Sequence, residues 1–276
     1  MNSFKKWFLL SIPGFLGFLA IYILPFFEST VYSFLSNMFE KKIVWFDNYR
    51  SVLSNEYFRL AARNTSVFLV TACFSVMLIS LLLAYGIFLY FRESAMIKSL
   101  LMIAFLVPDI AGMPFWQKIF DPVFFAYNVP DRFFSVFLSQ IPLLLIFLCK
   151  NCGLAVLIIN TSFKNTSGAA IEAARLDGAG NISLFTHIMF PAIKPNLLFV
   201  LVLTITEGLR SYRISYLYFN SDYPPSGAYF MQNYINNHFN KLDYELLSAA
   251  SVLFMLFTCI ITGIFYHLER RTMKDI

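Results

Sequence analysis

Apolar runs of about 20 residues recur along this chain, and they constrain its fold more than any other feature. A helix needs roughly 20 consecutive apolar residues to cross the hydrocarbon core of a bilayer. The composition agrees, because 58% of the residues are hydrophobic and only 13% are charged, whereas an ordinary soluble domain is about 25% charged. The sequence therefore predicts an all-α, polytopic membrane bundle.

Six runs are candidate transmembrane helices. We place them at about residues 7–34, 64–91, 97–117, 133–163, 193–219 and 246–268. The third run contains Pro108, Asp109, Gly112 and Pro114, and we expect a broken helix there. At membrane depth a break is tolerated only against protein or a water-filled cavity. No Gly/Ser linker interrupts the chain, so we expect one transmembrane domain over residues 1–276.

The distribution of basic residues suggests an orientation. The N-terminus, the 91–98 turn, the 164–194 loop and the C-terminal tail carry ten Lys and Arg residues, and the opposite loops carry eight. Basic residues favour the cytoplasmic side, so we expect both termini and the 164–194 loop to be cytoplasmic, in a bacterial plasma membrane. The net charge of +5 is therefore no evidence for nucleic acid, and we expect membrane lipid and no nucleic acid among the partners.

One small, polar and tightly patterned stretch lies between the fourth and fifth apolar runs. Asn165, Thr166 or Ser167 can cap a short helix rich in alanine, since such side chains accept hydrogen bonds from free helical N–H groups. We expect Gly178 to end that helix with a positive φ. A second helix over about 182–189 should then stop at Pro191, because proline interrupts helical hydrogen bonding.

This stretch resembles the EAA loop of binding-protein-dependent ABC importers, whose pattern is E-A-A, three residues, G, nine residues and I-x-L-P. Phe190 stands where that family has Leu. Shorter stretches at 45–65, 120–128 and 243–251 are similar to the sugar-importer branch, of the maltose or glycerol-phosphate kind and its first permease. The resemblance implies a type I ABC importer permease fold with a cytoplasmic coupling segment at 165–191. The implied ATPase-coupling residues are Glu172, Ala173, Ala174, Asp177, Gly178, Ile188 and Pro191.

The resemblance also implies partners: a second, similar permease, two ATP-binding subunits and an extracytoplasmic solute-binding protein. The chain has no P-loop pattern, so ATP and Mg²⁺ would be bound by the partner subunits. We expect the chain to be neither an enzyme nor the holder of a cofactor. Its three histidines lie in separate segments without metal-ligand spacing, and we interpret Cys149 and Cys152 as small apolar fillers.

Polar residues inside the fourth and fifth spans are the candidate substrate path: Lys150, Asn151, Glu207, Arg210 and Arg213. A charge at mid-bilayer costs roughly 2.5–3.5 kcal/mol on insertion scales, so each should face a cavity or a partner. Two interpretations remain open. In one the residues line a solute path, in the other Lys150 or Arg210 pairs internally with Glu207, and both can hold together.

Three basic residues against one acid would leave excess positive charge in such a path. An acidic solute, such as a uronic-acid oligosaccharide or a sugar phosphate, would use that charge. We therefore predict a permease subunit for a sugar or oligosaccharide, with acidic saccharides among the candidate solutes. The alternatives are a secondary transporter with a Lys150/Glu207 ion relay, which would usually show internal repeats, and a membrane scaffold, which needs no charges at mid-depth.

Overall fold

The computed structural model describes residues 3–36, 42–90, 95–125 and 132–274. These residues form helices throughout, apart from loops and an isolated antiparallel bridge between Leu35 and Ile43. By their contacts the residues fall into two units, 1–59 with 234–257 and 60–233 with 258–276. We describe each unit by itself. Of the 120–128 stretch, residues 126–128 lie outside the described part of the chain.

The first unit begins with a nearly continuous apolar helix. Its parts are α1 (Ser3–Phe18), a π-helical turn (Leu19–Ile23) and α2 (Leu24–Tyr32). The unit also holds α3 (Asp47–Ser54), the start of α4 (Glu56–Tyr90), most of α12 (Met231–Asn240) and the first part of α13 (Tyr244–Lys274).

The stretch Trp45–Tyr49 fastens α3 to the end of α2. The Asn48 amide donates hydrogen bonds to the carbonyl oxygens of Ser33 (3.0 Å) and Leu35 (2.8 Å). The hydroxyls of Tyr49 and Ser33 lie 2.6 Å apart. Side chains of the 45–65 stretch thus satisfy backbone groups at a helix end, so the residues that carry the resemblance there have a structural role.

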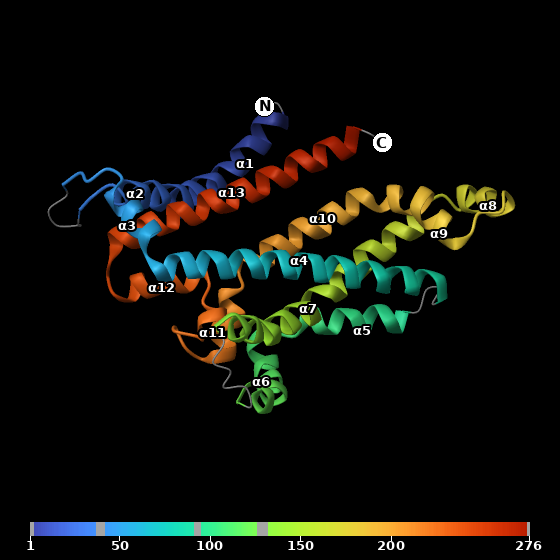
Figure 1. The fold of residues 1–276 in the computed structure, drawn as a ribbon. Helices are drawn as coiled ribbons and strands as arrows, with labels where there is room; N and C mark the ends of the chain where they lie inside the picture. Colours follow the sequence, from blue (N-terminus) through green and yellow to red (C-terminus); the bar gives the residue numbers. More distant parts are fainter. Residues whose placement is uncertain (1–2, 37–41, 91–94, 126–131, 275–276) are drawn as a thin grey trace. The chain divides into compact units, whose positions relative to one another are not determined.

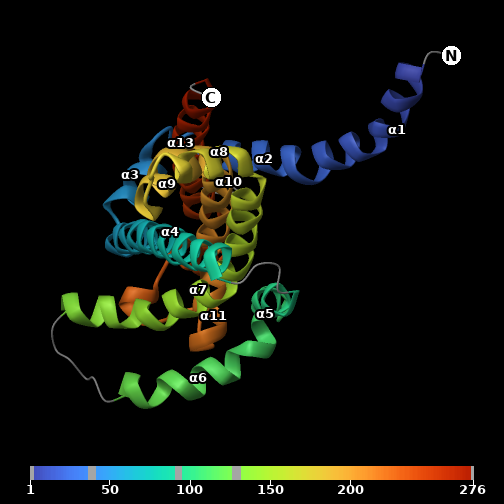
Figure 2. The ribbon, with the colours of Figure 1, turned by 90° about the vertical axis from the view of Figure 1, so that its right-hand side faces the viewer.

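The second unit is built around α7 (Arg132–Asn165). Its other helices are α5 (Ala95–Leu106), α6 (Asp109–Phe125), α8 (Gly168–Leu176), α9 (Asn181–Leu184), α10 (Phe190–Leu209) and α11 (Tyr212–Phe219). Helix α7 contacts α5, α6, α10 and α11, as can be followed in Figure 2. Phe68 of α4, Phe147 and Ile159 of α7 and Ile193 of α10 are almost completely buried in its core.

Asn64 and Thr65 of α4 hold the loop before α12. The Asn64 amide donates to the carbonyl oxygens of Ser226 (2.6 Å) and Tyr229 (3.0 Å). The Thr65 hydroxyl accepts from the backbone N–H of Met231 (3.0 Å). Both side chains are buried, so they replace the water that would otherwise satisfy this irregular backbone.

Among the described residues, five helices are long and apolar enough to cross a membrane: Ser11–Tyr32, Glu56–Tyr90, Ser139–Asn165, Asn181–Leu209 and Tyr244–His267. The predicted span at 97–117 is instead divided between α5 and α6, with Pro108 at the break. Proline donates no backbone hydrogen bond and disfavours a helical conformation at the residue before it. Each half is therefore shorter than a full span.

Two local expectations about the fifth span are wrong. The run 193–219 is interrupted at Arg210–Ser211, where α10 ends and α11 begins. Tertiary hydrogen bonds hold α11 separately, because Ser215 donates to the Ala228 carbonyl (2.8 Å). Pro191 does not stop a helix, since helix continues from Asn181 to Leu209. A π-helical turn at Phe185–Met189 directly precedes α10, and its wider hydrogen-bond spacing accommodates a proline in the next turn.

Candidate functional site

Helix α8 is short, capped at both ends and separate from the long helices. The Ser167 side chain accepts a hydrogen bond from the Ala170 N–H (3.4 Å), so the predicted N-cap is Ser167. At the other end Gly178 has φ 83°, as predicted. The N–H of Ala179 binds the Ala174 carbonyl (2.9 Å) and that of Gly178 binds Arg175 (3.1 Å). This is the Schellman arrangement, which fixes where the helix ends.

The exposed face of α8 combines a charge with small and apolar side chains. Glu172 and Ala173 are exposed, and Leu176 is 89% exposed. We call Glu172, Ala173 and Leu176 the α8 surface. Figure 1 shows α8 at the end of its unit, beyond α7 and α10. Small side chains let another protein approach closely, and an exposed leucine offers it an apolar anchor.

The other predicted coupling residues are less uniformly placed. Asp177, Gly178 and Pro191 are exposed, whereas Ala174 and Ile188 are half-buried. Asp177 is the C-cap residue of α8, and its backbone N–H binds the Ala173 carbonyl (3.0 Å). Asp177 and Gly178 therefore shape the turn that ends α8.

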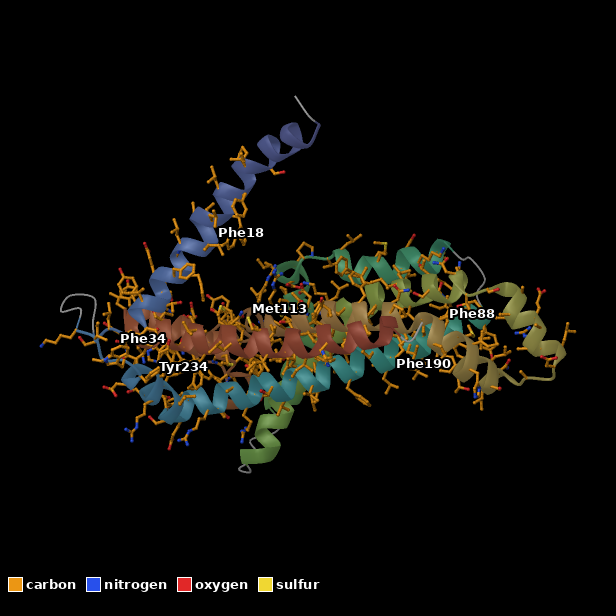
Figure 3. All side chains as sticks on the ribbon, turned by 90° about the horizontal axis from the view of Figure 1, so that it is seen from above. Phe18, Phe34, Phe88, Met113, Phe190 and Tyr234 are labelled. Carbon is orange, nitrogen blue, oxygen red and sulfur yellow. The ribbon has the colours of Figure 1, made fainter. Side chains whose placement is uncertain are left out.

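An aromatic cluster joins the segment after α8 to the long helices. Its members are Tyr85, Phe88, Phe163, Phe185 and Phe190. The ring centroids of Tyr85 and Phe185 lie 4.9 Å apart, those of Phe88 and Phe163 5.6 Å, and those of Phe185 and Phe190 6.0 Å. Figure 3 labels Phe88 and Phe190 on the part of the unit next to α8 and α9. Sequence reasoning missed this cluster, because its rings come from three helices.

Ring contacts and a hydrogen bond connect the segment that follows α8 to α4 and α7. Phe163 is fully buried, and the Tyr85 hydroxyl donates to the carbonyl of Asn181, the first residue of α9 (3.4 Å). Packed rings of this kind resist separation, because each pair is worth about 0.5–1.5 kcal/mol beyond its buried area. The cluster therefore packs the segment that follows α8 against α4 and α7.

A charged cavity of about 220 Å³ lies where two helix breaks meet. One break lies between α5 and α6, and the other between α10 and α11. All five predicted path residues line this charged cavity: Lys150, Asn151, Glu207, Arg210 and Arg213. Irregular backbone at membrane depth occurs next to cavities of this kind. The structure thus brings the five residues together, from α7 and from either side of the α10–α11 break.

Asp109 also lines the charged cavity, although the path residues predicted from the sequence did not include it. Its carboxylate is 6% exposed and lies 2.5 Å from the Lys150 Nζ and 3.2 Å from the Arg213 Nε. It is also the first residue of α6, where free N–H groups favour a negative charge. An aspartate directly after a proline in a broken span was the available signal.

Of the two pairs that the sequence offered for Glu207, the structure contains the one with Arg210. Arg210 and Glu207 lie 3.6 Å apart, but Lys150 pairs with Asp109 and not with Glu207. The Asn151 amide donates to the carbonyl of Phe147 in its own helix (2.9 Å). The charged residues thus line the charged cavity and are paired at the same time, as the sequence interpretation allowed.

A second cavity of about 230 Å³ shares Asp109 and Lys150 with the charged cavity. Its other lining includes Phe115 and Trp116 of α6, so we call it the aromatic cavity. The Trp116 ring stacks on Phe120 with centroids 5.9 Å apart and planes at 7°. The Asp109–Lys150 pair therefore borders a polar space and an aromatic one.

Most of the chain matches a known protein family. The family model described as "Binding-protein-dependent transport system inner membrane component" matches residues 7–274. The chain belongs to this family. It is therefore a multi-pass membrane permease component of a transporter, and not the ATPase.

This permease is similar to a probable ABC transporter permease of Mycoplasma pneumoniae, at 24% identity over 277 residues, covering 93% of this chain and 83% of that one. It is 24% identical over 254 residues to the trehalose/maltose transport system permease MalF of Thermococcus litoralis, covering 84% of this chain and 81% of the relative. A solved bacterial ABC transporter that imports the acidic polysaccharide alginate matches with a TM-score of 0.73 at 16% identity, covering 97% and 96% of the two chains. The expected ABC importer permease fold is thus confirmed.

Proposed function

We propose that this permease and a second permease of the same family form the path by which a sugar or oligosaccharide enters the cell. An extracytoplasmic binding protein delivers the solute, and two ATP-binding subunits drive the cycle. The family description supports dependence on a binding protein. The relative from Thermococcus litoralis, named for trehalose and maltose, supports a saccharide solute.

The observation that carries this proposal is the construction of α8. It is a separate helix, capped by Ser167 and closed at Gly178, whose α8 surface lies free at the end of its unit. Because the side chains of the α8 surface do not pack against the rest of the unit, this helix is suited to a cleft in another protein. The aromatic cluster ties the following segment to α4 and α7.

In the proposed cycle, ATP binding closes the ATP-binding subunits and moves α8. The aromatic cluster carries the displacement into α4 and α7, and the path changes from inward-facing to outward-facing. The charged cavity, at the two helix breaks, is then the part of the path that meets the solute. Helix breaks supply polar backbone and hinge positions together, which a changing path requires.

The proposal includes an orientation in a bacterial plasma membrane. The ten basic residues on the side of the termini and α8 make that side cytoplasmic, with α8 facing the ATP-binding subunits. ATP and Mg²⁺ bind to those subunits. A Lys150/Glu207 ion relay is not favoured, because Lys150 pairs with the buried carboxylate of Asp109.

Reversing the charge at Glu172 tests the proposal in the reconstituted transporter. Glu172→Lys should leave membrane insertion intact but lower solute uptake at least tenfold, with ATP hydrolysis no longer stimulated by the loaded binding protein. Glu56→Lys is the matched control, because Glu56 is also an exposed helical glutamate but lies outside the coupling segment. Unchanged uptake in Glu172→Lys would argue against docking through α8.

A further inference from the structure

The charges around the charged cavity do not balance. Lys150, Arg210 and Arg213 face two carboxylates, Asp109 and Glu207. Asp109 therefore reduces the positive excess that the sequence alone suggested, from two charges to one. A cavity lined by an excess of one sign of charge attracts ligands of the opposite sign. The remaining charge is the first sign of what the site binds.

The excess is carried by the residues that a ligand can reach. Asp109 and Lys150 are 6% and 22% exposed, so they form the buried part of the network. The Arg210 and Arg213 side chains are 69% and 60% exposed. The Arg213 Nε lies 3.2 Å from the Asp109 carboxylate, so Asp109 holds one edge of the planar guanidinium. A guanidinium held in this way is suited to a carboxylate or phosphate.

Two contacts join α6 to α11, the helix that carries Arg213. The Gln117 side chain of α6 donates to the carbonyl of Tyr218 in α11 (2.6 Å), and Asp109 of α6 binds Arg213 of α11. These contacts tie the two short helices that follow the two breaks. The position of Arg213 relative to α6 is therefore set before any solute binds, which lowers the cost of binding.

The aromatic cavity supplies the other half of a sugar site. Trp116 is held by its stack on Phe120, and Phe115 beside it is 63% exposed. Aromatic faces bind the apolar face of a pyranose ring, whereas guanidinium groups bind its charged substituents. The two cavities share Asp109 and Lys150 in their linings and are therefore adjacent.

We propose that the two cavities form a single subsite for an anionic sugar. The pyranose ring packs on Phe115 and Trp116 in the aromatic cavity, and its carboxylate or phosphate binds Arg213 and Arg210 in the charged cavity. Glu207 limits the positive charge that the ligand meets. This inference rests on the proposed function and adds to it the class of solute and the residues that select it.

Equilibrium binding to the assembled transporter, without its binding protein, tests the proposal. The probes are a trigalacturonate, a neutral trisaccharide of matched size and a hexose phosphate. The anionic probes should bind about tenfold or more tightly than the neutral one, as expected for a charge-assisted hydrogen bond. The better of the two anionic probes identifies the charged substituent as carboxylate or phosphate.

Three variants separate the parts of the subsite. Arg213→Gln should abolish most of the preference for anionic probes, whereas Arg213→Lys should retain part of it. Glu207→Gln should increase the preference, an effect in the opposite direction that loss of folding cannot produce. Trp116→Leu should weaken all three probes alike and leave their ratio unchanged, because it removes ring packing only.

The outcomes distinguish this inference from the function on which it rests. Equal binding of neutral and anionic probes, with Arg213→Gln unchanged in preference, would overturn the anionic subsite while leaving a sugar permease intact. Failure of every saccharide to bind or to be taken up, together with ATP hydrolysis that is unaffected by Glu172→Lys, would reject the proposed function itself.

Discussion

Gly153 of α7 lies directly against the backbone of Leu101 in α5. A Cβ atom added at Gly153 would lie 2.0 Å from the Leu101 carbonyl oxygen, closer than any real contact permits. Gly153 is three residues from Lys150 and therefore lies on the same face of α7. This close contact of α5 and α7 thus lies about one helical turn from the ion pair between Lys150 and Asp109.

We predict that Gly153→Ala destabilises the permease by about 1–3 kcal/mol, because backbone has to move to admit the methyl group. The displacement should also loosen the Asp109–Lys150 pair, and solute uptake should fall with the midpoint of thermal unfolding. Gly86→Ala on α4 is the control, because a Cβ there meets nothing within 4 Å. Equal unfolding midpoints in the two variants would contradict the packing argument.

The aromatic cluster should be required for coupling. Phe185→Ala removes the ring that contacts Tyr85 at 4.9 Å and Phe163 at 6.3 Å. We expect the reconstituted transporter to keep hydrolysing ATP while uptake per ATP falls severalfold, since α8 then moves without the long helices. Tyr85→Phe keeps the ring and loses only the 3.4 Å hydrogen bond to Asn181, so it should retain most of the uptake. If Phe185→Ala kept the normal uptake per ATP hydrolysed, the cluster would contribute to the stability of the fold and not to coupling.

Gly178 should be needed for its backbone conformation and not for space. Its φ is 83° and nothing lies within 4 Å of an added Cβ. Gly178→Ala should therefore cost about 1–2 kcal/mol of local stability, the penalty for an L-residue in the left-handed region. Faster amide hydrogen exchange in α8 and reduced solute uptake would reveal this loss of stability. Gly180→Ala, at φ −72° and also without close neighbours, should leave both measurements unchanged.

Local chemistry made much of this arrangement predictable from the sequence. The Ser167 cap, the Gly178 turn and the break at Pro108 each follow from the conformational preferences of one residue and its neighbours. The fold also followed, because apolar runs of membrane length and the EAA pattern both occur within continuous segments. The roles of the coupling and path residues remain predictions that the proposed variants test.

Contacts between distant segments were not predictable in the same way. Lys150 and Asp109 are 41 residues apart in the chain. From the sequence, Glu207 is an equally reasonable partner for Lys150, because the choice depends on how α5 and α6 pack. Likewise, the π-helical turn that accommodates Pro191 depends on the packing of Phe185 and Met189. The aromatic cavity needed α6 in position, since Trp116 alone carries no signal of a site.

His238 should make the stability of this permease depend on pH. It lies in α12, before the last membrane span, with its ring 4.4 Å from that of Tyr234 and its Nδ1 3.3 Å from Asp243. Burial lowers the pKa of His238 below its ordinary value of 6.5, and nearby Lys241 lowers it further. The hydrogen bond and charge of Asp243 oppose this shift only in part.

Because the folded pKa is the lower one, the unfolded chain takes up this proton first as the pH falls. The contribution to stability is therefore complete above pH 6.5 and is lost as the pH falls through the folded pKa. We predict that the unfolding midpoint falls less between pH 7.5 and 5.5 in His238→Gln than in the native permease. If Asp243 controlled the titration instead, acid would stabilise the native protein relative to the variant, and that result would contradict burial as the cause.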